Sequence, residues 1–167
     1  GVMRRGWYLL TELNVVRTYF RLFFFPVRQN LDYDYPIAKT LSEQGTFFSL
    51  IFLALIFLSA GFMVKKFPMI SFGVFWIFLT FSVESSVVQS DVIFEHRMYL
   101  PMVGFSIAFA AGMEVLFKDA KRLAVIGTVI AMLFSGAAYW RNRIWRDDYT
   151  LWQDVIAKSP HKYRGFS

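Results

Sequence analysis

Four long runs without a charged residue constrain this chain more than any other feature of its sequence. They cover residues 46–64, 67–83, 98–113 and 123–140. A helix needs about 20 mostly apolar residues to cross the hydrocarbon core of a bilayer. The alternative, an all-helical soluble core, would have to bury four such runs within 167 residues. We therefore predict an all-α, multi-pass membrane helix bundle with about four spans.

The composition agrees with this fold class and excludes several functions. Charged residues make up 18% of the chain, below the quarter or so that is usual in soluble domains. Without cysteine, the chain has no disulfide, thiol nucleophile or thiolate metal site. The net charge of +6 would suggest nucleic acid in a soluble protein, but here membrane lipid is the expected partner and nucleic acid is not. We find no glycine-rich phosphate loop, HExxH motif or Ser/His/Asp spacing, and expect no metal or cofactor.

The basic residues of the short loops predict an orientation. Lys65, Lys66 and the segment 118–122 supply the basic residues of two loops on one side, whereas Arg97 is the only Lys or Arg in the loop on the other side. Short basic loops are retained in the cytoplasm, which would place both chain ends outside it. The arginines within 141–146 argue the other way.

The segment 7–25 is apolar with one polar helical face. That face carries Thr11, Asn14, Arg17, Thr18 and Arg21. The pattern favours an amphipathic helix lying at the membrane interface. The alternative is a fifth, partly polar span packed against helices that this chain lacks.

Three regions follow from these patterns. We expect an interfacial helix and outer loop over 1–45 and the membrane bundle over 46–140. We expect an outer amphipathic helix over 141–167. Small residues repeat at four-residue steps in the last two spans, at Gly104, Ala108 and Gly112 and at Gly127, Ala131 and Ser135. Such faces let helix backbones approach closely, so we predict that these two spans pack as an antiparallel hairpin.

The connection between the second and third spans is the best candidate for a functional site. It gathers Glu84, Asp91, Glu95, His96 and Arg97 at the membrane surface, where charges tend to face a cavity or a partner. Arg97 could hold a phosphate through its planar guanidinium, and His96 could add a donor or shuttle a proton. Glu84 or Glu95 could orient those cations. A solvated loop with internal ion pairs is the equally open alternative, and no catalytic residue is assigned.

Two further acidic positions have simpler interpretations. Asp32 and Asp34 lie close enough in sequence to share a divalent cation, but a turn before Pro36 is favoured. Glu114 precedes Lys118 by one helical turn, which predicts a structural ion pair.

Two longer stretches resemble a known family. ESSVVQSDVIFEHRMYLPMVGF (84–105) and RNRIWRDDYTLWQDVIAKSPHKYR (141–164) resemble the transmembrane-and-tetratricopeptide-repeat proteins and their bacterial relatives. These are similar to protein O-mannosyltransferases, which have the GT-C membrane fold. The stretch FFFPVRQNLDYDYP (23–36) looks like the family's outer loop before its later spans.

The resemblance implies transfer of a sugar from a polyprenyl-phosphate donor to a protein on the outer side of the membrane, here a bacterial inner membrane. Tetratricopeptide repeats would follow outside, in agreement with the loop charges. The family's catalytic acid lies in an early outer loop, upstream of the part that matches here. We therefore expect the late membrane portion of such a glycosyltransferase, with His96 and Arg97 near the lipid phosphate and the catalytic acid on a longer chain. The alternative is a non-catalytic scaffold subunit of a larger membrane complex with a protein partner.

Overall fold

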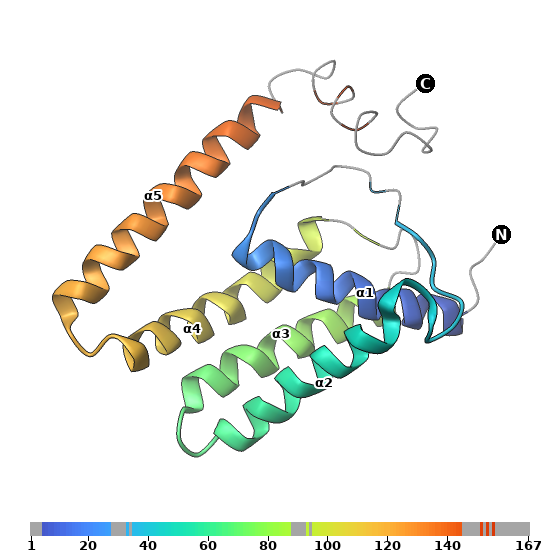
Figure 1. The fold of residues 1–167 in the computed structure, drawn as a ribbon, viewed down its shortest axis with the longest axis horizontal. Coiled ribbons are helices and arrows are strands. Elements are labelled where there is room, and N and C mark those ends of the chain that lie inside the picture. Colours follow the sequence, from blue (N-terminus) through green and yellow to red (C-terminus); the bar gives the residue numbers. More distant parts are fainter. Residues whose placement is uncertain are drawn as a thin grey trace. The chain divides into compact units, whose positions relative to one another are not determined.

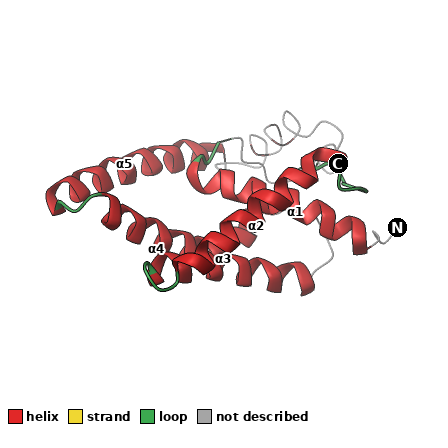
Figure 2. Ribbon diagram, turned by 60° about the horizontal axis from the view of Figure 1, so that its bottom comes forward, coloured by secondary structure: helices red, strands yellow, loops and turns green. Residues whose placement is uncertain are grey.

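The computed structural model describes residues 5–27, 33, 35–87, 93, 95–144, 151, 153 and 155. Its elements in chain order are α1 (Arg5–Phe24), the 3-10 turn η1 (Glu43–Gly45), α2 (Thr46–Met63), α3 (Pro68–Val87), the 3-10 turn η2 (Glu95–Met98), α4 (Tyr99–Leu116) and α5 (Ala120–Ile144). Figures 1 and 2 show these helices, and no strand occurs in the described part of the chain. The all-α prediction is confirmed.

The chain divides into two compact units. The first comprises residues 1–27 and 35–111, and it holds α1, α2, α3 and most of α4. The second comprises residues 28–34 and 112–167, and it holds the end of α4 and all of α5. Each unit is described separately below.

Three helices are long and apolar enough to cross a membrane. They are Thr46–Met63, Tyr99–Leu116 and Ala120–Arg143. The predicted count of four is one too many by this measure, because the apolar part of α3 covers only Pro68–Val83. Proline at the first helical position begins that helix, and Glu84 ends its uncharged part. Length and composition thus support a membrane protein with three strong spans and one shorter apolar helix.

α1 packs closely against the other helices of its unit, and its position at the membrane interface stays a prediction. Ten of its residues are buried, and they include the polar residues Thr11, Glu12 and Asn14. The aromatic residues of α1 meet those of the other helices: Tyr19 stacks on Phe81, Phe20 contacts Phe52 and Phe78, and Phe23 stacks on Phe105. The helices that would cover a partly polar helix are therefore present in this chain.

The buried polar face of α1 is satisfied by the start of α2. Asn14 Nδ2 donates to Thr46 Oγ1 at 2.8 Å, and Ser49 Oγ donates to Asn14 Oδ1 at 2.6 Å. Thr46 Oγ1 in turn donates to the Glu43 carbonyl of η1 at 2.6 Å. Gly45 makes the tight entry to α2 with φ +70°, a conformation that other residues rarely adopt. Buried polar groups need such partners, and these bonds fix α1 against α2.

The segment after the first loop covers the rest of this polar face. The Ala38 amide donates to Thr11 Oγ1 at 2.9 Å, and Ala38 itself is fully buried. Tyr35 OH lies 3.0 Å from Thr18 Oγ1. Lys39 Nζ lies 5.5 Å from the centre of the Trp7 ring. Side chains that predicted a water-facing surface therefore bind backbone and side chains of residues 35–49.

The small face of α4 packs on α3, where we had expected it to meet the last span. A Cβ added to Gly73 of α3 would meet the Gly104 carbonyl and would lie 2.7 Å from the Ala108 nitrogen. Trp76 Nε1 also donates to the Leu100 carbonyl at 3.0 Å. The small residues do allow close backbone approach, as predicted, but the sequence did not reveal the partner helix.

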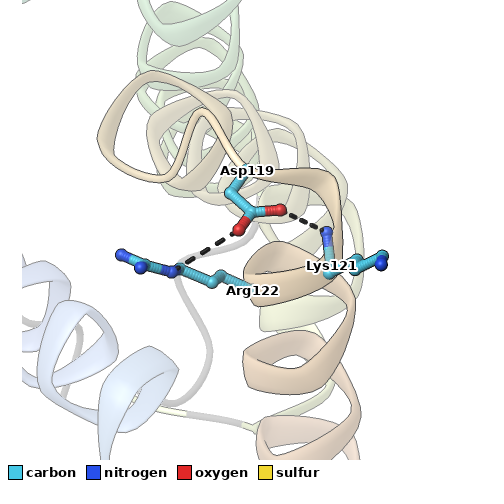
Figure 3. Close-up of polar contacts among 3 residues, drawn as sticks. All are labelled: Asp119, Lys121 and Arg122. Atoms are coloured by element: carbon cyan, nitrogen blue, oxygen red, sulfur yellow. Dashed lines mark hydrogen bonds and ion pairs between the residues drawn. The ribbon is translucent and has the colours of Figure 1, made fainter.

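In the second unit, Asp119 directly precedes α5 and caps it. Figure 3 shows its carboxylate accepting a hydrogen bond from the Lys121 amide at 2.9 Å and pairing with Arg122 Nε at 3.5 Å. A side-chain oxygen that binds an amide of the first turn caps a helix, and its charge suits the helix dipole. The structure shows this ion pair in place of the predicted pair between Glu114 and Lys118.

Several predictions fall outside the described residues. Asp32 and Asp34 are not described. Of the predicted tail helix only Leu151, Gln153 and Val155 are described, and they are helical.

Candidate functional site

Arg97 is the one predicted site residue whose side chain the structure describes. It lies in η2, directly before α4, and its side chain is 5% exposed. Burying a guanidinium is costly unless hydrogen bonds and an opposite charge accompany it. The solvated-loop interpretation therefore does not hold for Arg97.

The partners of Arg97 come from the first helix. The Tyr8 hydroxyl lies close enough to the side chains of Arg97 and Glu12 for both to act on its pKa. Tyr8 is 4% exposed and Glu12 is 7% exposed, so all three groups are buried together. Because Tyr8 and Glu12 are separated by one helical turn, they present both groups on the same face of α1.

The pKa of Tyr8 depends on the charges in this cluster. Burial raises the pKa of the Tyr8 phenol, and the negative charge of Glu12 raises it further. The hydrogen bond and positive charge of Arg97 act in the opposite direction. The net increase keeps the phenol neutral, so it can donate to one partner and accept from another.

The other predicted site residues lie near Arg97 along the chain, but their side chains are outside the described part. Glu95 and His96 belong to η2, and Glu84 belongs to the last turns of α3. Orientation of Arg97 by Glu84 or Glu95, and a donor role for His96, remain predictions.

Tyr8 and Glu12 are the residues that the sequence analysis missed. A carboxylate on the otherwise apolar face of this helix was the available signal, because charges at membrane depth are rare and usually have a partner. The amphipathic pattern of residues 7–25 drew attention to the opposite polar stripe instead. The partner loop is also far away in sequence, so no local spacing connects it to α1.

A cavity of about 670 Å³ opens beside this cluster, between α1, α2 and α3. Arg5, Tyr8 and Glu12 form its polar wall. Its apolar walls are made by Leu9, Leu13, Val16, Leu50, Leu53, Ala54, Phe57, Phe78 and Phe81, with Ser82 at the edge. Cavities of several hundred Å³ with a few convergent polar groups are typical of ligand sites. This one has one polar wall and otherwise apolar walls.

The described side chains of this cluster can bind polar and charged groups. Among the described residues, no group of three or more His, Cys, Asp or Glu side chains could hold a metal ion. The cluster offers a cation, an anion and a phenol, which together can hold a phosphate and the hydroxyl groups of a sugar.

Comparison with known proteins yields no relative: no family model, no curated protein and no solved structure matches the chain.

Proposed function

We propose that this chain is the late membrane portion of a GT-C-like glycosyltransferase that uses a polyprenyl-phosphate sugar donor. Arg97 would hold the donor phosphate, with His96 as a second donor. The observation that carries the proposal is the buried cluster of Arg97, Tyr8 and Glu12 beside an apolar cavity. The class of donor is inferred from the resemblance of residues 84–105 to the transmembrane-and-tetratricopeptide-repeat proteins.

The cluster and the cavity would bind different parts of the proposed donor. A phosphate suits a guanidinium, which stays charged and can donate two parallel hydrogen bonds. The prenyl chain suits the cavity walls formed by residues such as Leu53, Phe57 and Phe78. Sugar hydroxyls would meet Tyr8 and Glu12, which line the same cavity. The catalytic acid would be supplied by a part of the protein upstream of this chain.

Donor binding by Arg97 variants tests the proposal. Purified Arg97→Ala and Arg97→Lys are compared with the unaltered chain for binding of polyprenyl phosphate, with thermal stability measured alongside. Removing one partner of a buried charge pair costs about 3–5 kcal/mol, so Arg97→Ala should lose both binding and stability. Arg97→Lys keeps the charge without the planar fork, and it should lose binding by more than it loses stability.

Arg122→Ala is the matched control, because that side chain is 78% exposed and belongs to the first turn of α5. It should leave both measurements unchanged. Unchanged donor binding in both Arg97 variants would remove Arg97 from the site.

The alternative is a non-catalytic scaffold subunit that holds a protein partner in a larger complex. The observation that favours it concerns α5, where no residue of Ala120–Arg143 is buried. Tyr139 and Trp140 are 66% and 68% exposed there. If polyprenyl phosphate does not bind to the unaltered chain, this alternative takes precedence.

We propose that the chain lies in a bacterial inner membrane with both chain ends outside the cytoplasm. Lys65 and Lys66 follow α2, and Lys121 and Arg122 lie in the first turn of α5. Short basic loops favour the cytoplasmic side. Because the chain has no cysteine, Lys66→Cys and Lys121→Cys each introduce a single label site. Labelling of either cysteine by an impermeant thiol reagent in intact cells would show that the predicted orientation is wrong.

A further inference from the structure

A second cationic site lies on α1, away from the Arg97 cluster. Arg17 and Arg21 are one helical turn apart, so their guanidinium groups share one face of the helix. Like charges at this spacing repel each other. Among the described residues, no carboxylate lies within 4.0 Å of either guanidinium. Their closest hydrogen-bond acceptors are two carbonyl groups, those of Gly45 and Val27, at 3.5 and 3.4 Å.

A phenol contacts Thr18, a residue between the two arginines in sequence. Tyr35 OH is 3.0 Å from Thr18 Oγ1, and Thr18 donates its own hydrogen to the Asn14 carbonyl at 2.9 Å. Tyr35 must therefore be the donor in its contact with Thr18. The positive charges of Arg17 and Arg21 both act on the Tyr35 phenol. The single phenolic hydrogen is thus used to hold the segment after the first loop against α1, on the helix face that carries the two guanidinium groups.

The position of Arg17 places this site at the end of an apolar helix. Its guanidinium reaches the carbonyl of Gly45, the residue directly before α2 begins. Arginines at such ends direct their charged groups to the level of the lipid headgroups. An anion at this level would meet both arginines and offset their mutual repulsion.

The same face of α1 continues into exposed aromatic residues. Phe24 and Phe25 follow Arg21 by three and four positions, and they are 51% and 67% exposed. An apolar surface beside a cationic pair suits a molecule with an anionic head and hydrocarbon chains. Free inorganic phosphate would use only the cationic half of this surface.

We propose that Arg17 and Arg21, beside Tyr35, form a headgroup site for one anionic phospholipid, whose acyl chains lie on Phe24 and Phe25. The site is separate from the proposed donor site, since it shares no residue with the Arg97 cluster. It would anchor α1 and the segment after the first loop to the bilayer.

Lipid retention by the full chain tests this site. Delipidated protein in neutral detergent is titrated with phosphatidylglycerol or phosphatidylcholine, and bound lipid is counted by native mass spectrometry. We expect one phosphatidylglycerol to bind with clear preference over phosphatidylcholine. Arg21→Gln should weaken this binding about fivefold, and Arg17→Gln/Arg21→Gln should bring it to the level of phosphatidylcholine.

The control variant is Lys65→Gln/Lys66→Gln, which removes two exposed charges after α2. It should retain the preferred phosphatidylglycerol. An equal loss in this control would show that net charge alone attracts the lipid, and it would overturn the site. Arg21 is exposed, so the single variant Arg21→Gln decides the matter if circular dichroism shows that the double variant is unfolded.

A third arm of the titration uses polyprenyl phosphate and inorganic phosphate. Preferred binding of polyprenyl phosphate at Arg17 and Arg21, without binding of phosphatidylglycerol, would overturn the assignment to a phospholipid. If inorganic phosphate binds, Arg21→Gln weakens that binding about fivefold, and no lipid binds, Phe24 and Phe25 have no role in the site. A result at Arg97 leaves this site unaffected, because the variants are separate.

Discussion

The first and last helices of this chain differ in a way that reverses the rule for soluble proteins. α1 carries Glu12, Asn14 and Arg17, yet ten of its residues are buried. The most apolar 18-residue window of α5 has a mean hydropathy of 1.8, yet no residue of Ala120–Arg143 is buried. Lipid accepts apolar side chains as readily as a protein core does, but it cannot satisfy polar ones. In a membrane, the more polar helix is the one that needs protein around it.

The largest expected difference between the two regions lies in glycine substitutions. Gly73→Ala adds a Cβ that would lie 2.7 Å from the Ala108 nitrogen and 2.8 Å from its Cβ. Overpacking against backbone costs about 1–3 kcal/mol. Gly127→Ala on α5 meets nothing within 4 Å and should be neutral or mildly stabilising. Unfolding in mixed micelles, followed by circular dichroism, measures both. Equal stability of the two variants would contradict the close α3–α4 contact.

Removal of one buried polar group should have the next largest effect. Asn14→Leu leaves the hydroxyl groups of Thr46 and Ser49 without the amide that now joins them. Interhelical hydrogen bonds in membranes contribute about 0.6 kcal/mol on average and up to about 1.7, and we expect the upper part of this range.

Thr128→Val supplies the matched control on α5, where the hydroxyl donates to the Ala124 carbonyl of its own helix at 2.8 Å. It should change the unfolding free energy by less than about 0.5 kcal/mol, as is usual for exposed substitutions. If Asn14→Leu is the milder of the two, the polar contact between α1 and α2 does not hold α1 in place.

The start of α5 should depend on its cap more than on its ion pair. Asp119→Ala removes the acceptor of the Lys121 amide and should cost about 1 kcal/mol of helix stability. Arg122→Ala removes only an exposed partner and should cost less than about 0.5 kcal/mol. Hydrogen exchange of the first-turn amides measures both. Greater exchange in Arg122→Ala than in Asp119→Ala would assign the helix start to the ion pair.

The smallest effect concerns Tyr35. Tyr35→Phe removes one hydrogen bond to Thr18 and should cost about 0.5–1 kcal/mol. Burial raises the pKa of the Tyr35 phenol above its usual 10.0. The neutral phenol is therefore favoured in the folded state. Its contribution to stability is complete below pH 10.0 and is lost as pH rises through the folded pKa.

The measurement compares the unfolding free energies of the two proteins below and above pH 10.0. The difference between them should shrink at the higher pH. Tyr99→Phe, at a site 78% exposed, controls for the loss of one phenol. A difference that grows with pH would mean that the folded state favours the phenolate.

Much of the helical layout could be predicted from the sequence. The uncharged run 46–64 corresponds to α2 (Thr46–Met63), and the run 98–113 corresponds to α4 (Tyr99–Leu116). The run 123–140 lies within the longer α5 (Ala120–Ile144). The difference at α5 has a physical cause. Asp119 caps its start, and Arg141 and Arg143 suit the negative end of the helix dipole, so charged residues extend the helix past the apolar run.

The site could be predicted only in part, because hydropathy identifies helices but not their partners. Arg97 stood out as a charge at the membrane surface, and its burial agrees with a role beyond a solvated loop. Tyr8 and Glu12 did not stand out, since their relation to Arg97 exists only after α1 packs on the rest of the unit. The partner of Gly104 was missed for the same reason. Gly73 lies in a different helix without a repeated small-residue pattern.

The hydrogen bonds of Asn14 also have a consequence for the order of biosynthesis. Its partners Thr46 and Ser49 follow it by 32 and 35 residues, and Arg97 is synthesised only after α1, α2 and α3. At roughly 5–20 residues per second, α1 must wait for several seconds before all its polar groups can be satisfied. During that interval it is too polar to rest in lipid alone. α1 is made before α2, α3 and η2, so its polar groups must be hydrated or held by the insertion machinery until those elements have been synthesised.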